Sequence, residues 1–238
     1  MAVIDGELAR SAMTAAYRAL TADVCRLGED ELAAASRCRG WMRADVLFHV
    51  LLDAQRALVT FATPATGEPD VDFASYWEPF RPGSPGSAEH ARFVRRVSAS
   101  YPSSLEIARQ WAETAAAAVH AASQLPAGQM VATQGHVLAA ADFLATLAVE
   151  ATIHHLDLQA AGDGLDGLDG LDGLAVLAGP AAEGLTAVRA TLDGILGGPA
   201  PAAWDDVTYA LKGTGRSPLS PAENRQLGAL AARFPLLG

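Results

Sequence analysis

The stretch ATLAVEATIHHLDLQ, residues 145–159, combines helix-forming Ala and Leu with a glutamate and a histidine four residues apart. In an α-helix, Glu150 and His154 therefore share one face, one turn apart. The residues around Glu150 are mostly apolar, and a glutamate is rarely buried unless it is paired or bound to a metal. Taken alone, Glu150 has the ordinary interpretation of a surface carboxylate, and His154 that of a core histidine. Together they predict two metal ligands on a helix.

A third candidate ligand, His49, also lies among apolar residues. Two imidazoles and a carboxylate with open positions form a common catalytic metal site. Asp53 follows His49 by one turn, so it can either orient the imidazole or face solvent, and Asp157 has the same two interpretations. His155 is rotated by about 140° from Glu150 and should point away from the cluster. Three further histidines have no partner spacing and are interpreted as non-ligands: His90, His120 and His136.

The composition favours a helical protein and excludes several classes of function. The 238 residues are 50% hydrophobic, with Ala and Leu dominant and aromatics few, and the net charge is −10. Nucleic-acid binding is not expected, because phosphate contacts need a concentrated basic face. Neither a signal peptide nor a membrane-spanning run is apparent. Cys25 and Cys38 are interpreted as ordinary half-buried residues, and together these features predict a cytoplasmic protein.

Helical periodicity predicts an up-and-down four-helix bundle over residues 1–162, within a mainly α fold. No strand is expected in this part. Between the second and third helical stretches, residues 62–86 form a long connection rich in Pro, Gly and aromatic residues, which is typical of a functional loop. The four long helices are predicted at Gly6–Leu27, at Arg43–Phe61, at Ser103–Ser123 with a capping box, and from about Gly135 to Gly162. A further helical pattern runs from Ser87 to a break at Tyr101-Pro102.

The remainder is predicted to be an acidic linker followed by a small helical or α+β extension that packs on the bundle. The linker, DGLDGLDGLDGL at 163–174, does not follow the ligand spacing of a calcium loop. In the extension, residues 175–238, we expect a helix from about Leu174 to Leu196 and a short strand from Trp204 to Lys212. Ser220, Pro221 and Glu223 predict the start of a last helix.

Three segments carry a family resemblance, namely Cys38–His49 (CRGWMRADVLFH), Glu150–Leu158 and Leu211–Glu223. They resemble the mycothiol-dependent maleylpyruvate isomerase family, within the DinB-like group of metal-binding four-helix bundles. The family pattern that the first segment resembles is C-x-G-W-[ST]-x-x-[DE]-[LV]-x-x-H. Glu150–Leu158, EATIHHLDL, resembles E-x-x-x-H-x-x-D-[LI], and Leu211–Glu223 is similar to the family's tails. One departure is Met42, which replaces a Ser or Thr suited to capping a helix and removes about 1 kcal/mol of stabilisation.

The resemblance implies a divalent metal, typically zinc, held by His49, Glu150 and His154. It also implies that a low-molecular-weight thiol such as mycothiol serves as cosubstrate and is activated for addition to a small electrophile, in an isomerase or an S-transferase. An arginine is expected to hold substrate carboxylates, with Arg216 as first candidate and Arg81 as second. We expect the protein to be a monomer or a homodimer, without a nucleic-acid or membrane partner.

Two alternatives share the same ligands. A DinB-like bundle can serve as a non-catalytic metal-binding or stress-response module, because a fold does not determine a function. Two histidines and a carboxylate also form the iron triad of oxygenases, although those enzymes usually carry it on a β-barrel. A helical sequence disfavours this second alternative.

Overall fold

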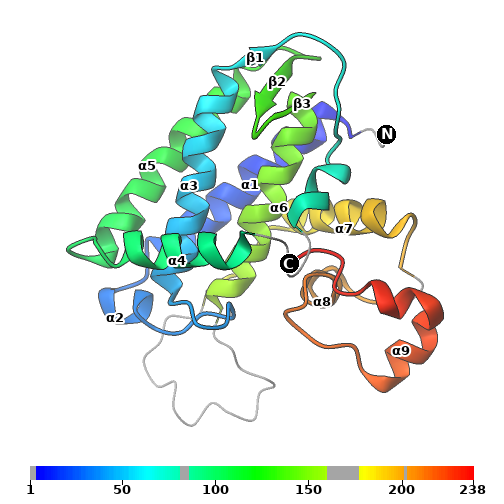
Figure 1. Ribbon diagram of the computed structural model, residues 1–238. Helices are drawn as coiled ribbons and strands as arrows, with labels where there is room; N and C mark the ends of the chain where they lie inside the picture. The colour runs from blue at the N-terminus through cyan, green and yellow to red at the C-terminus, as the bar shows by residue number, and fades with distance from the viewer. Residues whose placement is uncertain (1–3, 81–85, 160–176, 201–202) are drawn as a thin grey trace.

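In the computed structural model, which describes residues 4–80, 86–159, 177–200 and 203–238, four long helices form the body of the molecule (Figure 1). They are α1 (Gly6–Val24), α3 (Arg43–Phe61), α5 (Ser104–Ser123) and α6 (Ala140–Leu158). Helices α1 and α3 each pack on both α5 and α6. The mainly α, DinB-like bundle predicted from the sequence is thereby confirmed.

The helices of the bundle begin close to the residues that their capping signals indicate. Asp5 caps α1 by accepting from the backbone N–H groups of Glu7 and Leu8. Helix α3 begins at Arg43 as predicted, and Met42 supplies no side-chain cap there. Asp45 instead accepts the Met42 N–H at 2.9 Å. The first helix is shorter than predicted, ending at Val24 rather than Leu27.

The start of α5 is held from two sides. Ser103 is the N-cap as predicted and accepts the N–H of Leu105, but among the described residues Glu106 does not complete the predicted capping box. The carboxylate of Glu29, from the short helix α2 (Glu29–Leu32), accepts from the Ser103 hydroxyl at 2.6 Å and from the Ser104 N–H at 2.7 Å. An acidic group at a helix N-terminus is stabilising because the backbone N–H groups there carry partial positive charge. Helix α2 is thus anchored to α5.

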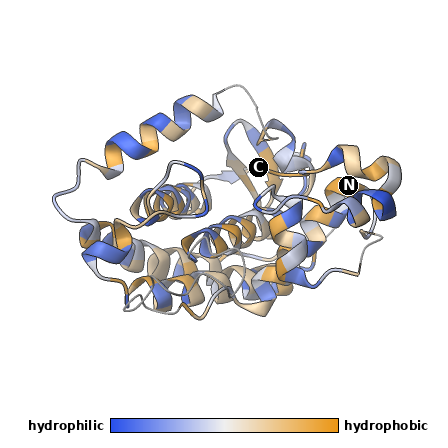
Figure 2. Ribbon diagram, turned by 90° about the horizontal axis from the view of Figure 1, so that it is seen from below, coloured by the Kyte–Doolittle hydropathy of each residue, from blue (hydrophilic) through white to orange (hydrophobic). Residues whose placement is uncertain are grey.

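Helix α6 is buried on nearly all sides because it contacts α1, α3 and α7. This explains why its sequence is apolar around the whole helix rather than along one stripe. Inside the bundle, Tyr17 of α1 and Trp111 of α5 pack with ring centroids 5.1 Å apart. In Figure 2, hydrophobic residues (orange) and hydrophilic ones (blue) are mixed along the helices. Helix α6, which carries two of the candidate ligands, is itself almost entirely buried.

A small antiparallel sheet at one end of the bundle corrects the prediction of a strand-free body. Its strands are β1 (Pro64–Ala65), β2 (Met130–Thr133) and β3 (His136–Ala139), in the order β1-β2-β3. Gln134 and Gly135 form a two-residue turn with φ of 49° and 85°, which is the backbone of a tight hairpin. This hairpin replaces the predicted first turns of the fourth helix, so α6 begins at Ala140.

Two segments outside the four-helix bundle lie along one side of it (Figure 1). The aromatic part of the predicted loop forms the 3₁₀ helix η1 (Ser75–Phe80). Helix α4 (Ser87–Ser98) follows and packs on α3. Tyr76 and Trp77 of η1 are buried, so the aromatic residues of the loop do cover a surface.

The C-terminal part contains α7 (Ala182–Leu196), α8 (Asp206–Gly213), α9 (Pro221–Leu227) and the 3₁₀ helix η3 (Gly228–Arg233). Helix α7 packs on α1 and α6, and at Gly184 the approach is so close that an added Cβ would lie 2.2 Å from Thr152 Oγ1. The predicted strand at 204–212 is wrong, because Asp205 caps α8 by accepting the Thr208 N–H. The Ser220–Glu223 capping box is confirmed.

Two features of the prediction lie outside the described residues, namely the Asp-Gly-Leu repeat at 163–174 and Arg81. Within the described part of the chain, no helix is long and apolar enough to cross a membrane. Cys25 is an exposed free thiol, and Cys38 is a half-buried one.

Candidate metal centre

Helices α3 and α6 bring the three predicted ligands to one point. His154 Nε2 lies 3.2 Å from Glu150 Oε2, and His49 Nε2 lies 3.7 Å from the same oxygen. The two imidazole rings are nearly perpendicular, with centroids 4.7 Å apart. The spacing of four residues aligns Glu150 and His154 on one face of α6, and packing of α3 against α6 adds His49.

This cluster has the size and chemistry of a divalent cation site. One ligand atom from each residue can be chosen so that all three lie within 4.8 Å of one another. A tetrahedral ion with ligand distances of about 2.0–2.1 Å places its ligands about 3.3 Å apart, close to the separations found here. Two imidazole nitrogens and a carboxylate oxygen also match the donors that a catalytic zinc uses. His49, Glu150 and His154 therefore fit such an ion.

His154 is supported from behind by a buried ion pair. Its Nδ1 lies 2.9 Å from Asp157 Oδ2, and the guanidinium of Arg216 binds both oxygens of Asp157, at 3.1 and 2.8 Å. Burial opposes ionisation of Asp157, yet its bonds to His154 and Arg216 hold the pKa of this carboxyl well below its usual range. The thiol of Cys38 also donates to Asp157, at 3.1 Å. Asp157 therefore has the first of its two predicted roles, because it contacts the imidazole of His154 and does not face solvent.

Charges within the cluster stabilise one another when no cation is bound. Burial alone would favour neutral His154, but Asp157, Cys38 and Glu150 raise the pKa of His154 well above its ordinary value. Burial similarly opposes the charge of Glu150, while hydrogen bonds from His154 and His49 lower its pKa. A proton on His154 thus occupies the place that a cation would take.

His49 is supported by a different kind of partner. Its Nδ1 lies 3.2 Å from Nε2 of His90, which is exposed on α4. Asp53, which we expected either to orient His49 through the nitrogen not used for metal or to face solvent, does neither. One of its oxygens is buried and lies 3.7 Å from His49 Nε2, on the same side as Glu150. Burial raises the pKa of Asp53.

A cavity of about 740 Å³ opens in front of the cluster. This volume is in the range that binds small molecules. Its floor contains His49, Glu150 and His154, and one wall is aromatic, formed by η1 together with Phe143. Gln134 of the hairpin donates to the Tyr76 hydroxyl at 3.1 Å and so joins the sheet to that wall. The last residues, Leu237 and Gly238, complete the lining.

Three arginines line the cavity, and they differ in how they are engaged. Arg216 uses Nε and both terminal nitrogens for Asp157 and the Thr214 carbonyl. Arg39 and Arg56 are exposed and form no hydrogen bond or ion pair with the described residues. Arg216 thus lies at the site, but its guanidinium is bound to the protein. Its role in binding a substrate carboxylate, like that of Arg81, stays a prediction.

The sequence interpretation missed His90 and Cys38 as neighbours of the ligands. His90 has no spacing signal because its contact with His49 joins two different helices. Cys38 sits in the C-x-G-W segment that precedes α3, so its position in that motif was the available signal. His155 behaves as predicted, since it points away and bonds Asp23 at 2.9 Å.

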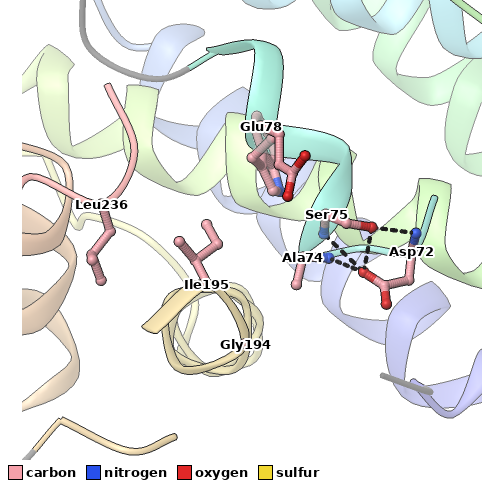
Figure 3. Close-up of a pocket in the computed structure, with 8 residues that line it drawn as sticks. Asp72, Ala74, Ser75, Glu78, Gly194, Ile195 and Leu236 are labelled. Atoms are coloured by element: carbon pink, nitrogen blue, oxygen red, sulfur yellow. Dashed lines mark hydrogen bonds between the residues drawn. The ribbon is translucent and has the colours of Figure 1, made fainter. Parts of the chain in front are cut away.

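A smaller cavity of about 220 Å³ lies between η1 and α7. Figure 3 shows Gly194 and Ile195 of α7 on one side, with Ala74, Ser75 and Asp72 on the other. Asp72 accepts from the backbone of Ala74 and Ser75, as the dashed lines mark. Among the described residues, both groups of potential metal donors contain His154 and so belong to the larger cavity.

Comparison with known proteins identifies the family. Searches of curated proteins and of solved structures gave no match. The family model described as "Mycothiol maleylpyruvate isomerase N-terminal domain" matches residues 13–159, which include all three candidate ligands and the four helices of the bundle except the start of α1. The chain therefore belongs to the mycothiol maleylpyruvate isomerase N-terminal domain family.

Proposed function

We propose that this protein is a divalent-metal-dependent enzyme, with zinc as the first candidate, that activates a low-molecular-weight thiol such as mycothiol. The reaction is the addition of that thiol to a small electrophile, ending either in a conjugate or in a cis–trans isomer. The observation that supports this most directly is the convergence of His49, Glu150 and His154 at the base of a cavity of about 740 Å³.

The protein residues have separable roles in this proposal. His49, Glu150 and His154 hold the cation, which when bound would lower the pKa of a thiol and supply a thiolate at neutral pH. Asp157 keeps the Nδ1 proton of His154, so that Nε2 is presented to the ion, and Arg216 holds Asp157 in place.

The cavity also suits an electrophile that carries negative charge. Arg39 and Arg56 line it without an ion pair among the described residues, so their guanidinium groups are available to a carboxylate. The aromatic wall of Tyr76, Trp77 and Phe80 can pack on the apolar part of the same molecule. Arg81 and Arg216 remain the candidates that the family resemblance implied.

Metal analysis tests the site assignment first. Purified protein should contain one divalent ion per chain, and His49→Ala should lose it. His120→Ala is the matched control, because His120 is exposed on α5 outside the cavity. Metal-free wild type, or full occupancy in His49→Ala, would show that these residues are not the ligands.

Thiol chemistry is the second test. The metal-loaded protein should take up mycothiol in a calorimetric titration and consume a member of a panel of maleyl-type and epoxide electrophiles. Uptake of metal with neither thiol binding nor loss of any electrophile would instead support the non-catalytic binding module.

A further inference from the structure

The hydrogen bond between His90 and His49 joins the metal centre to a helix outside the bundle. His49 directs Nε2 toward Glu150, which leaves Nδ1 as its second polar atom. Among the described residues, that atom contacts His90 Nε2 at 3.2 Å. The two rings meet edge to face, with centroids 5.3 Å apart and planes at 73°. This geometry is specific, although the ring of His90 is exposed.

When a cation is bound, the contact can hold the proton of His49 on one nitrogen. An imidazole that binds a cation through Nε2 must hold its proton on Nδ1. His90 must then accept that proton with Nε2 and carry its own proton on Nδ1.

We propose that His90 is a positioning residue of the metal centre, which fixes the tautomer and ring orientation of His49 by accepting its Nδ1–H. The inference rests on the proposed function only in taking His49 as a metal ligand. It extends that proposal to α4, whose first residues, with Gly86 before them, also line the cavity. The position of this cavity wall and the geometry of the ion are thereby linked.

Two substitutions separate the hydrogen bond from the bulk of the ring. His90→Phe keeps an aromatic ring against His49 and removes the acceptor. His90→Gln restores an acceptor oxygen on a flexible side chain. Because His90 is exposed on α4, neither change removes a buried core residue. His120→Ala again serves as the control.

Cobalt binding to the metal-free proteins measures the effect. Partners that orient a metal ligand typically contribute about 10–100-fold to metal affinity. In competition with a chelator, we expect His90→Phe to bind Co²⁺ at least about tenfold more weakly, with an altered visible absorption spectrum. His90→Gln should recover most of the affinity, and His120→Ala should match wild type. Equal affinity and spectra for wild type and His90→Phe would overturn the inference.

A measurement without metal separates this inference from the proposed function. In ¹⁵N spectra of the metal-free protein at pH 8, where Glu150 accepts the Nε2–H of His49, the Nδ1 resonance of His49 should show a hydrogen bond with His90 in wild type and lose it in His90→Phe. An unchanged Nδ1 resonance would refute the role of His90. If wild type binds no cobalt, the proposed function fails while the spectra still decide whether His90 positions His49. If cobalt binds but no thiol reacts, only the enzymatic part fails.

Discussion

The two candidate histidine ligands are held in contrasting ways. Behind His154 lies Asp157, whose side chain is 0% exposed and which is bound by Arg216 and Cys38. Behind His49 lies His90, which is exposed on a helix outside the bundle. The first arrangement is built into the interior and contributes to folding as well as to the site. The second lies at the surface and can change with little effect on the fold.

Removing the ion pair behind His154 should produce the largest effect on stability. In Asp157→Asn, the largely buried guanidinium of Arg216 loses its charged partner, and the free energy of unfolding should fall by about 3 kcal/mol. Urea unfolding of the metal-free protein measures this. His90→Phe, the equivalent change behind His49, should alter it by no more than about 0.5 kcal/mol.

The double variant Asp157→Asn/Arg216→Gln serves as the control for charge, because it removes both members of the ion pair. It should be more stable than Asp157→Asn alone. A loss below about 1 kcal/mol in the single variant would mean that the ion pair is no more important for folding than the surface contact of His90.

The back of α6 offers a second way to disturb the His154 side. In Gly184→Ala, the new methyl group would lie 2.2 Å from Thr152 Oγ1, so α7 must move away from α6. Overpacking of this kind costs about 1–3 kcal/mol, which thermal or urea unfolding would detect. Adding Thr152→Ala removes the hydroxyl and should restore part of the loss. If the double variant recovers no stability, the strain does not arise from the contact with the Thr152 hydroxyl.

The pH dependence of metal affinity tests the protonation of His154. In the metal-free protein, the raised pKa of His154 means that a cation must displace a proton. Cobalt affinity should therefore increase by about tenfold per pH unit from about pH 6 upward, until the pH passes that raised pKa. Because folding raises the pKa of His154, the free energy that its protonated form contributes to folding is present at low pH. This contribution is lost as the pH rises through the raised pKa. Asp157→Asn should flatten the slope, whereas an equally steep slope in that variant would contradict the role assigned to Asp157.

The smallest expected effect concerns the helix that carries His49. Met42 is 53% exposed and gives α3 no side-chain cap. Met42→Ser should raise the free energy of unfolding by about 0.5–1 kcal/mol, because a hydroxyl can accept a free N–H of the first turn. Cobalt affinity should stay at the wild-type value, since the ligands do not move. A stability gain accompanied by altered metal binding would show that the start of α3 and the metal centre are coupled.

Sequence reasoning was strongest where a local spacing carried the information. The spacing of Glu150 and His154 places them on one face of α6, and the capping signals at Ser103 and Ser220 lie at real helix starts. Sequence reasoning failed where a short segment was compatible with more than one secondary structure. Alternation of Val207, Tyr209 and Leu211 indicated a strand, but the Asp205 cap decides in favour of a helix. The hairpin at 130–139 was missed because each of its strands has only four residues.

The contacts that complete the site were beyond local reasoning. His90 reaches His49 only because α4 packs on α3, and the engagement of Arg216 depends on Asp157, 59 residues earlier in the chain. Periodicity reports which face of a helix is buried, but it does not report which partner lies against that face. Contacts between residues so far apart in the sequence can be identified only from the folded structure.

The lining of the cavity has a consequence for how selectivity can change. The donor atoms come from α3 and α6, and their neighbour His90 comes from α4, whereas another part of the lining comes from η1 and Leu237. Amino-acid replacements at Tyr76, Phe80 or Leu237 can therefore reshape the space for an incoming molecule and leave the ion-binding geometry intact. A protein divided in this way is a suitable scaffold for evolving new substrate preferences in the laboratory, because reactivity and recognition are encoded in separate parts of the chain.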